Sequence, residues 1–141
     1  MKWSKLKKKL ESTLAANVAG RIQFHTTRYR QAHDQMGRSW ITVDGTEITN
    51  MQHLSGAAAA ESPSRFHAGV FTAYDLPEAM AEFLNMSIEN ALVSENPLIR
   101  ALAVVDRRTG KRRIQSMTPS EEVFPVNEFI RLRQTNLECD G

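Results

Sequence analysis

An apolar stripe at helical spacing opens the chain. It consists of Trp3, Leu6, Leu10 and Leu14, which share one face of an α-helix. Four lysines fall away from the stripe, namely Lys2, Lys5, Lys8 and Lys9. The pattern predicts an amphipathic helix that ends before Gly20 and carries these lysines on its solvated face.

β-branched and aromatic residues dominate the next part of the chain, residues 21–51. They predict a strand over residues 21–30. Asp44-Gly45 separates two further β-prone runs, residues 39–43 and 46–50. An Asp-Gly pair is a strong hairpin signal because both central residues of the tight turn need a positive φ. We therefore expect a three-stranded antiparallel meander.

A change in composition follows the meander. Residues 52–66 contain four consecutive alanines, three serines and Pro63, which predicts a mobile surface loop. Asp75 then begins a sequence that resembles a capping box, with a proline in the first helical turn. Apolar residues at helical spacing continue from there, so we expect one long helix from Asp75 to about Ser94.

The last third of the chain contains a mostly apolar run, Leu98–Val105, which predicts a buried strand. Arg107–Gly110 reads as a turn whose glycine meets the need for a positive φ. Lys111–Met117 is then expected to return as a fifth strand. Apolar residues at positions 126, 129 and 130 predict a last short helix, and residues 136–141 are expected to fray.

These elements together predict an α+β fold with the order α-βββ-α-ββ-α. About five antiparallel strands would form the sheet, and the helices would pack on one of its faces. The length of 141 residues, with 41% hydrophobic and 24% charged residues, is typical of a single globular domain. We expect residues 1–141 to form that domain, with His25, Tyr29 and some of the arginines on the uncovered sheet face.

The single cysteine, Cys139, excludes a disulfide within the chain, which favours a reducing compartment. No continuous apolar run follows the basic N-terminus, so no signal peptide is expected. No stretch approaches the ~18 apolar residues of a membrane span. The sequence therefore predicts a cytoplasmic protein without a membrane partner.

Charge is unevenly spread along the chain although its net value is only +2. Residues 1–50 hold nine Lys/Arg against four Asp/Glu, and residues 51–100 hold two against six. Such a split can serve an acidic partner or a second copy of the chain. The candidate interaction or anion-binding residues are Arg28, Arg30, Arg107, Arg108, Lys111, Arg112 and Arg113.

Enzyme motifs are missing from the sequence. It contains no Gly-rich phosphate loop, no G-x-S-x-G elbow and no helical zinc-ligand spacing. We therefore assign no catalytic residue, no metal and no cofactor. One candidate pocket remains, because a histidine followed by an aspartate could act as a base with its orienting carboxylate. Its residues would be His25, Tyr29, His33 and Asp34, although a His-Asp pair more often simply lies on a loop and His25 more often is a partly exposed strand residue.

Several segments together resemble a small family of uncharacterised bacterial proteins. They are Lys2-Trp3-Ser4-Lys5, Thr27-Arg28-Tyr29-Arg30 with His33-Asp34-Gln35, Val43-Asp44-Gly45 and Asp106-Arg107-Arg108-Thr109-Gly110-Lys111-Arg112. The family that this resemblance indicates has no assigned activity, so it carries no catalytic residue to this chain. It implies a bacterial, cytosolic origin, and cargo of a mobile gene cassette is a source that we consider.

Three functional hypotheses follow. The first is a non-enzymatic interaction module that self-associates as a homodimer, because the charge split is complementary and no catalytic motif accompanies it. The alternative is a nucleic-acid-binding protein that uses the basic strands and the Arg107–Arg113 hairpin. The second alternative is a small enzyme or ligand binder with a pocket near His25 and His33.

Overall fold

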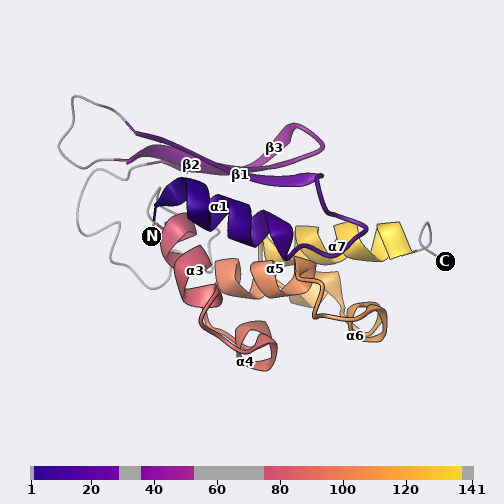
Figure 1. The fold of residues 1–141 in the computed structure, drawn as a ribbon. Helices are drawn as coiled ribbons and strands as arrows, with labels where there is room; N and C mark the ends of the chain where they lie inside the picture. Colours follow the sequence, from indigo (N-terminus) through magenta and orange to yellow (C-terminus); the bar gives the residue numbers. More distant parts are fainter. Residues whose placement is uncertain (1, 29–35, 53–74, 138–141) are drawn as a thin grey trace.

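The computed structural model describes residues 2–28, 36–52 and 75–137, which form a sheet layer and a helix layer (Figure 1). Within these residues, six α-helices and a short 3-10 helix accompany a three-stranded sheet. In chain order the elements are α1 (Trp3–Ser12), β1 (Ile22–Arg28), β2 (Met36–Val43), β3 (Thr46–Gln52), α3 (Asp75–Phe83), α4 (Ile88–Leu92), α5 (Pro97–Val105), α6 (Lys111–Gln115), η2 (Pro119–Glu121) and α7 (Val126–Leu137).

The sheet is an antiparallel meander with the strand order β1-β2-β3, as the sequence predicts. The predicted hairpin turn is confirmed, since Asp44 and Gly45 have φ values of 54° and 82°. Phe24 of β1 lies opposite Ile41 of β2, and both are buried. Because side chains alternate along a strand, these residues define the face that packs on the helices.

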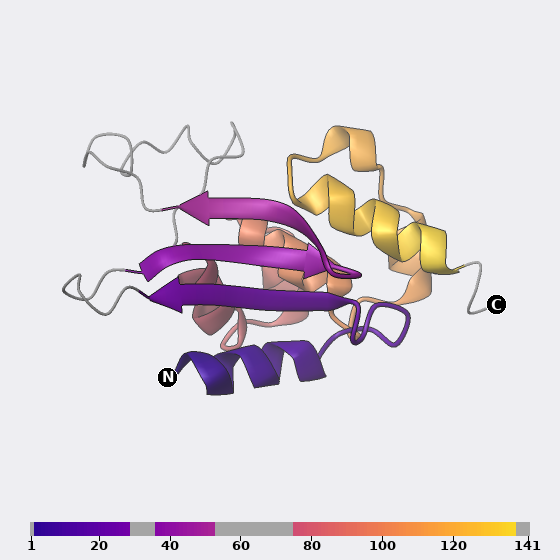
Figure 2. The same cartoon turned by 90° about the horizontal axis from the view of Figure 1, so that it is seen from above.

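Helix α1 runs beside β1, at one edge of the sheet (Figure 2). Leu6 and Leu10 are buried, so the predicted apolar stripe packs into the core. Two polar residues of the same helix bind the backbone of the edge strand. Lys7 Nζ donates to the carbonyl of Phe24 at 2.8 Å, and the amide of Phe24 donates to Glu11 Oε2 at 3.2 Å. The exposed edge of β1 is thereby partly covered.

The predicted fourth strand is wrong, because Leu98–Val105 belongs to helix α5. Asn96 caps this helix by accepting a hydrogen bond from the amide of Leu98 at 3.0 Å, and Pro97 occupies the first turn. Helix α5 contacts α3, α4 and α7. It is therefore surrounded on most sides, and a helix in that position needs no polar stripe.

The predicted fifth strand and its hairpin turn are also wrong. Lys111–Gln115 forms helix α6, and Arg107–Gly110 connects two helices. Gly110 has a φ of −75° and is the N-cap of α6, so the expected positive φ is not needed. The sheet consequently has three strands in the described residues, where the sequence predicted about five.

The predicted helix from Asp75 to Ser94 is divided into α3 and α4. Ser87 begins the second piece, since its hydroxyl accepts a hydrogen bond from the amide of Asn90 at 3.2 Å. A serine at this position is a typical N-cap, so a separate helix begins after it. Most of the predicted loop, residues 53–66, and the end of the predicted frayed tail, residues 138–141, lie outside the described residues.

Candidate interaction site

The basic segment Arg107–Arg113 divides into one cation that is bound to a buried carboxylate and several that form no ion pair within the described residues. The Asp106 carboxylate, 1% exposed, accepts hydrogen bonds from the amide, Nε and Nη2 of Arg108 at 2.8, 3.0 and 3.2 Å. The hydrogen bonds to Asp106 raise the pKa of the Arg108 guanidinium, which also lies 5.7 Å from the centre of the Phe83 ring. Arg108 thus stabilises the turn, while its side chain, 46% exposed, still lies at the surface.

A second arginine stabilises the same turn from inside the protein. Arg133 of α7 is 4% exposed. Its Nη1 donates to the carbonyls of Val104, Asp106 and Thr109 at 2.9, 3.4 and 2.7 Å. The last carbonyls of a helix have no partner within it, and a cation there is favoured by the helix dipole. Arg133 therefore caps α5, a role that no local motif in the sequence indicates.

The turn is also tied to the chain segment that follows α1. The amide of Ala15 donates to the carbonyl of Val105 at 2.8 Å, and the amide of Arg107 donates to the carbonyl of Thr13 at 2.9 Å. Leu14 and Asp106 form an isolated antiparallel bridge there. These contacts join residues ninety or more positions apart in sequence and hold the end of α1 beside the α5–α6 turn.

Four further cations of the predicted surface are exposed at this end of the molecule. We call Arg107, Lys111, Arg112 and Arg113 the α6 surface; all four are exposed, and none forms an ion pair with another described residue. Ile114 of the same helix is buried. Gln134 Nε2 donates to the carbonyls of Ile114 and Met117 at 3.0 and 2.8 Å, which holds α6 against α7.

The lysine side of α1 is hollowed. Lys5, Lys8, Lys9 and Ser12 line an open depression of about 280 Å³, which we call the lysine hollow. These side chains are exposed, and the three lysines form no ion pair within the described part of the chain. The lysine side chains contribute both apolar stems and charged ends to such a surface.

Acidic residues gather on α3, α4 and the turn after α4. Glu78, Glu82, Glu89 and Glu95 are exposed, and none of them forms an ion pair with a described residue. Val93, at the end of α4, is 77% exposed and is the exposed large hydrophobic residue of the described chain. Glu89 lies four residues before Val93, a spacing that places both on one side of a helix. We call Glu89, Val93 and Glu95 the α4 patch.

His25 lies on the sheet face opposite the helices, since its neighbour Phe24 points into the core. Its ring stacks on Trp40 at a centroid distance of 5.0 Å and an interplanar angle of 14°. Its Nε2 lies 3.0 Å from Thr42 Oγ1. The other residues of the predicted pocket, Tyr29, His33 and Asp34, lie outside the described residues, as does Arg30. Arg28 is the last residue of β1, and its side chain also lies outside them.

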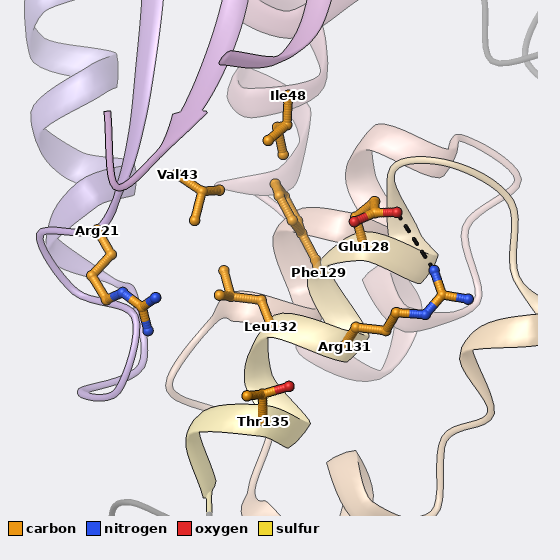
Figure 3. A pocket seen from close by; sticks show the side chains of 8 residues that line it. All are labelled: Arg21, Val43, Ile48, Glu128, Phe129, Arg131, Leu132 and Thr135. Atoms are coloured by element: carbon orange, nitrogen blue, oxygen red, sulfur yellow. Dashed lines mark hydrogen bonds and ion pairs between the residues drawn. The ribbon is translucent and has the colours of Figure 1, made fainter. Parts of the chain in front are cut away.

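A groove that the sequence did not indicate lies between the β2–β3 hairpin and α7 (Figure 3). Its volume is about 250 Å³, slightly below the ~300 Å³ of the smallest typical ligand pockets. Two ion pairs border it, Arg21 Nη2 with Asp44 Oδ2 at 2.6 Å and Arg131 Nη1 with Glu128 Oε1 at 3.5 Å. The apolar lining consists of Val43, Ile48, Phe129 and Leu132. The balanced charges of the border favour no ligand of a particular charge.

In the part of the chain that the structure describes, no group of three or more His, Cys, Asp or Glu side chains is placed to hold a metal ion. Across the same residues, no helix combines the length and apolar character that crossing a bilayer requires.

A family model confirms the resemblance that the sequence motifs indicated. The SF0329 protein family model matches residues 2–65 and 56–134. No curated protein matches the chain, and no solved structure matches it. The family description names no activity and no ligand.

Proposed function

The chain belongs to the SF0329 protein family, and we propose that it acts as a non-enzymatic interaction module that self-associates through the lysine hollow and the α4 patch. In this dimer, Val93 of one copy enters the lysine hollow of the second copy. Glu89 and Glu95 then face Lys5, Lys8 and Lys9 of that copy. The same contact, made in both directions, gives a two-fold symmetric pair.

The observation that carries this proposal is a pair of exposed charge clusters of opposite sign that form no ion pair within the described residues. Besides the hydrogen bonds to Asp106, the charge of Glu89 helps to raise the pKa of Arg108, with which Glu89 forms no ion pair. Lys5, Lys8 and Lys9 have no ion-pair partner among the described residues, and neither have Glu89 and Glu95. Complementary potentials steer association and select its orientation. The apolar lysine stems suit an apolar side chain such as Val93, which is 77% exposed.

A non-enzymatic role is supported by the use of the buried polar groups. Asp106, Thr109 and Arg133 are buried. Asp106 binds Arg108 and Thr109 Oγ1 donates to the carbonyl of Ala103 at 2.7 Å, while Arg133 caps α5. Buried polar groups that are hydrogen-bonded in this way stabilise the turn between α5 and α6.

The expected dimer is weak and sensitive to salt. Each contact consists of one small apolar side chain, Val93, and of the exposed charges around it. Exposed ion pairs contribute only about 0.2–1 kcal/mol each. Sedimentation velocity should therefore be followed up to about 1 mM protein, where a contact worth about 4 kcal/mol is half occupied. We expect dimers whose fraction falls as the salt concentration rises.

Charge reversal provides the decisive test. Lys5→Glu/Lys8→Glu/Lys9→Glu makes both surfaces acidic, and Glu89→Lys/Glu95→Lys makes both basic. Each variant alone should be monomeric because like charges then face each other. An equimolar mixture should form heterodimers, since every contact in the mixed pair is again between opposite charges.

The matched control is Glu121→Lys/Glu128→Lys, which changes the same number of exposed glutamates outside the α4 patch. This control should dimerise as the unmodified protein does. A protein that stays strictly monomeric up to about 1 mM, or a lysine-reversed variant that still dimerises by itself, would overturn the proposal.

We place this module in the cytoplasm of a bacterium, and a mobile gene cassette is one genetic setting consistent with that. The single cysteine supports the assignment to a cytoplasm, because cysteine-poor proteins without disulfides suit a reducing compartment. Expression of a tagged chain in a bacterial host followed by fractionation tests it, and recovery in the periplasm would contradict it.

A further inference from the structure

We propose that the α6 surface binds the phosphate backbone of a nucleic acid, independently of base sequence. The α6 surface consists of Arg107, Lys111, Arg112 and Arg113, and it plays no part in the proposed dimer contact. Its four cations are exposed and have no ion-pair partner among the described residues. A negatively charged partner can therefore bind each of these cations without breaking an ion pair within the described residues.

The backbone beneath these side chains is held in place before any partner binds. On one side, the amide of Arg107 is bonded to the carbonyl of Thr13 at 2.9 Å. On the other, Ile114 is buried and Gln134 binds its carbonyl. Between them, Arg108 is bound to Asp106. Binding would then cost mainly the ordering of the four side chains, because the segment that carries them is already ordered.

Charge complementarity favours a phosphate backbone as the partner. Three of the four cations are arginines, whose planar guanidinium forms paired hydrogen bonds with phosphate. Lys111, Arg112 and Arg113 are consecutive in a helix, so they project about 100° apart around its axis. Side chains spread in this way can reach successive phosphates of a curved strand.

The residue types of the α6 surface also predict that it does not recognise base sequence. Arg107, Lys111, Arg112 and Arg113 are accompanied by no aromatic residue between positions 107 and 117. Stacking on bases usually depends on aromatic side chains, and phosphate contacts alone carry no base sequence. We therefore expect similar affinity for duplexes of unrelated sequence.

The test measures how binding depends on salt. Anisotropy of a short fluorescein-labelled DNA duplex is titrated with the full chain between about 50 and 200 mM salt. Four phosphate contacts predict a slope of about −3.6 for the logarithm of the binding constant against that of the salt concentration. Arg112→Ser/Arg113→Ser should reduce the slope to about −1.8, because two contacts are removed.

The control is Lys8→Ser/Lys9→Ser, which removes two exposed cations from the lysine hollow. It should leave the slope of duplex binding unchanged and should weaken dimerisation in sedimentation velocity. Arg112→Ser/Arg113→Ser should do the reverse. The two variants thereby separate this proposal from the proposed dimer, so each can fail without the other. Circular dichroism melting of both variants checks that they fold.

Three results would overturn the proposal. One is the lack of salt-dependent duplex binding by the unmodified chain. Another is an equal loss of binding in the Lys8→Ser/Lys9→Ser control, which would show that the cations of α1 contribute as much as those of α6. The third is equal or tighter binding to poly-glutamate or to vesicles of anionic lipid, which would assign the surface to an acidic protein or to a membrane surface.

Discussion

Asp106 and Arg108 are joined by three hydrogen bonds although they lie only two positions apart in the chain. The amide and guanidinium of Arg108 donate to one carboxylate at 2.8, 3.0 and 3.2 Å. The burial of the two side chains is unequal, since Asp106 is 1% exposed and Arg108 is 46% exposed. This inequality makes the two residues respond differently to substitution.

Arg108→Ala should destabilise the protein more than Asp106→Asn does. Removal of the arginine leaves a buried carboxylate without its cation, which typically costs about 3 kcal/mol. The asparagine variant instead leaves a half-exposed guanidinium that water can solvate, and its side-chain oxygen can still accept the amide hydrogen bond. We expect a loss of about 1 kcal/mol for it. Urea denaturation of both variants measures the difference, and equal losses would contradict this account.

Arg133→Met should remove about 3 kcal/mol from the free energy of unfolding. The substitution keeps an apolar stem in place and leaves the carbonyls of Val104 and Thr109 without their charged donor. The matched control is Arg131→Met, two positions earlier on α7. Its side chain is 52% exposed and, among the described residues, is paired with Glu128 at 3.5 Å, so the control should lose less than about 0.5 kcal/mol. Similar urea midpoints for the two variants would refute the capping role.

Glu11→Ala should open the edge of β1. The amide of Phe24 then loses its side-chain acceptor, and we expect a loss of about 1 kcal/mol. Hydrogen exchange at the amide of Phe24, followed by NMR, should become faster than in the unmodified protein. Ser4→Ala, an exposed position on the same helix, is the control and should leave this exchange rate unchanged. An unaltered rate in Glu11→Ala would show that the contact does not protect the strand.

Asp44→Asn should lower the stability of the protein at neutral pH but not in acid. The hydrogen bond from Arg21 holds the pKa of Asp44 below its usual value of 3.8. A lowered folded-state pKa contributes stability above the unfolded pKa, and this contribution is lost as the pH falls through the folded-state value. Asparagine tolerates the positive φ of 54° at this position, so the turn is preserved.

The difference in urea midpoint between Asp44→Asn and the unmodified protein should therefore be largest above about pH 5 and should shrink below about pH 4. Raising the salt concentration at neutral pH should also reduce it, because both side chains are partly exposed. A difference that stays constant across this pH range would exclude the charge of Asp44 as its cause.

The mistaken strands show where a sequence pattern is ambiguous. A short apolar run such as Leu98–Val105 fits a buried strand and a buried helix equally well. Asn96 and Pro97 favoured the helix, since an Asn cap followed by proline is a typical helix start. The basic turn after Val105 favours a strand instead, because its glycine resembles a hairpin residue, but that glycine has a φ of −75°.

The interaction surfaces were predictable only in part. The sequence identified Arg107, Arg112 and Arg113 as candidate cations, and their exposure is a property of residue type. The same pattern included Arg108, which differs only in having Asp106 two residues before it. A local Asp-x-Arg spacing permits this ion pair, but the burial of the carboxylate depends on α1 and α7, which are distant in sequence.

By itself, the sequence determined the local elements: the amphipathic α1, the Asp44-Gly45 hairpin and the start of α3 at Asp75. These depend on spacing, turn chemistry and caps, all of which act within a few residues. Only the tertiary structure decided that Arg133 caps α5 and that Arg107 lies beside Thr13, and it resolved the ambiguous run Leu98–Val105 as a helix. The physical reason is that burial and long-range hydrogen bonds depend on which segments contact each other in the folded chain. A local sequence pattern does not indicate which segments those are.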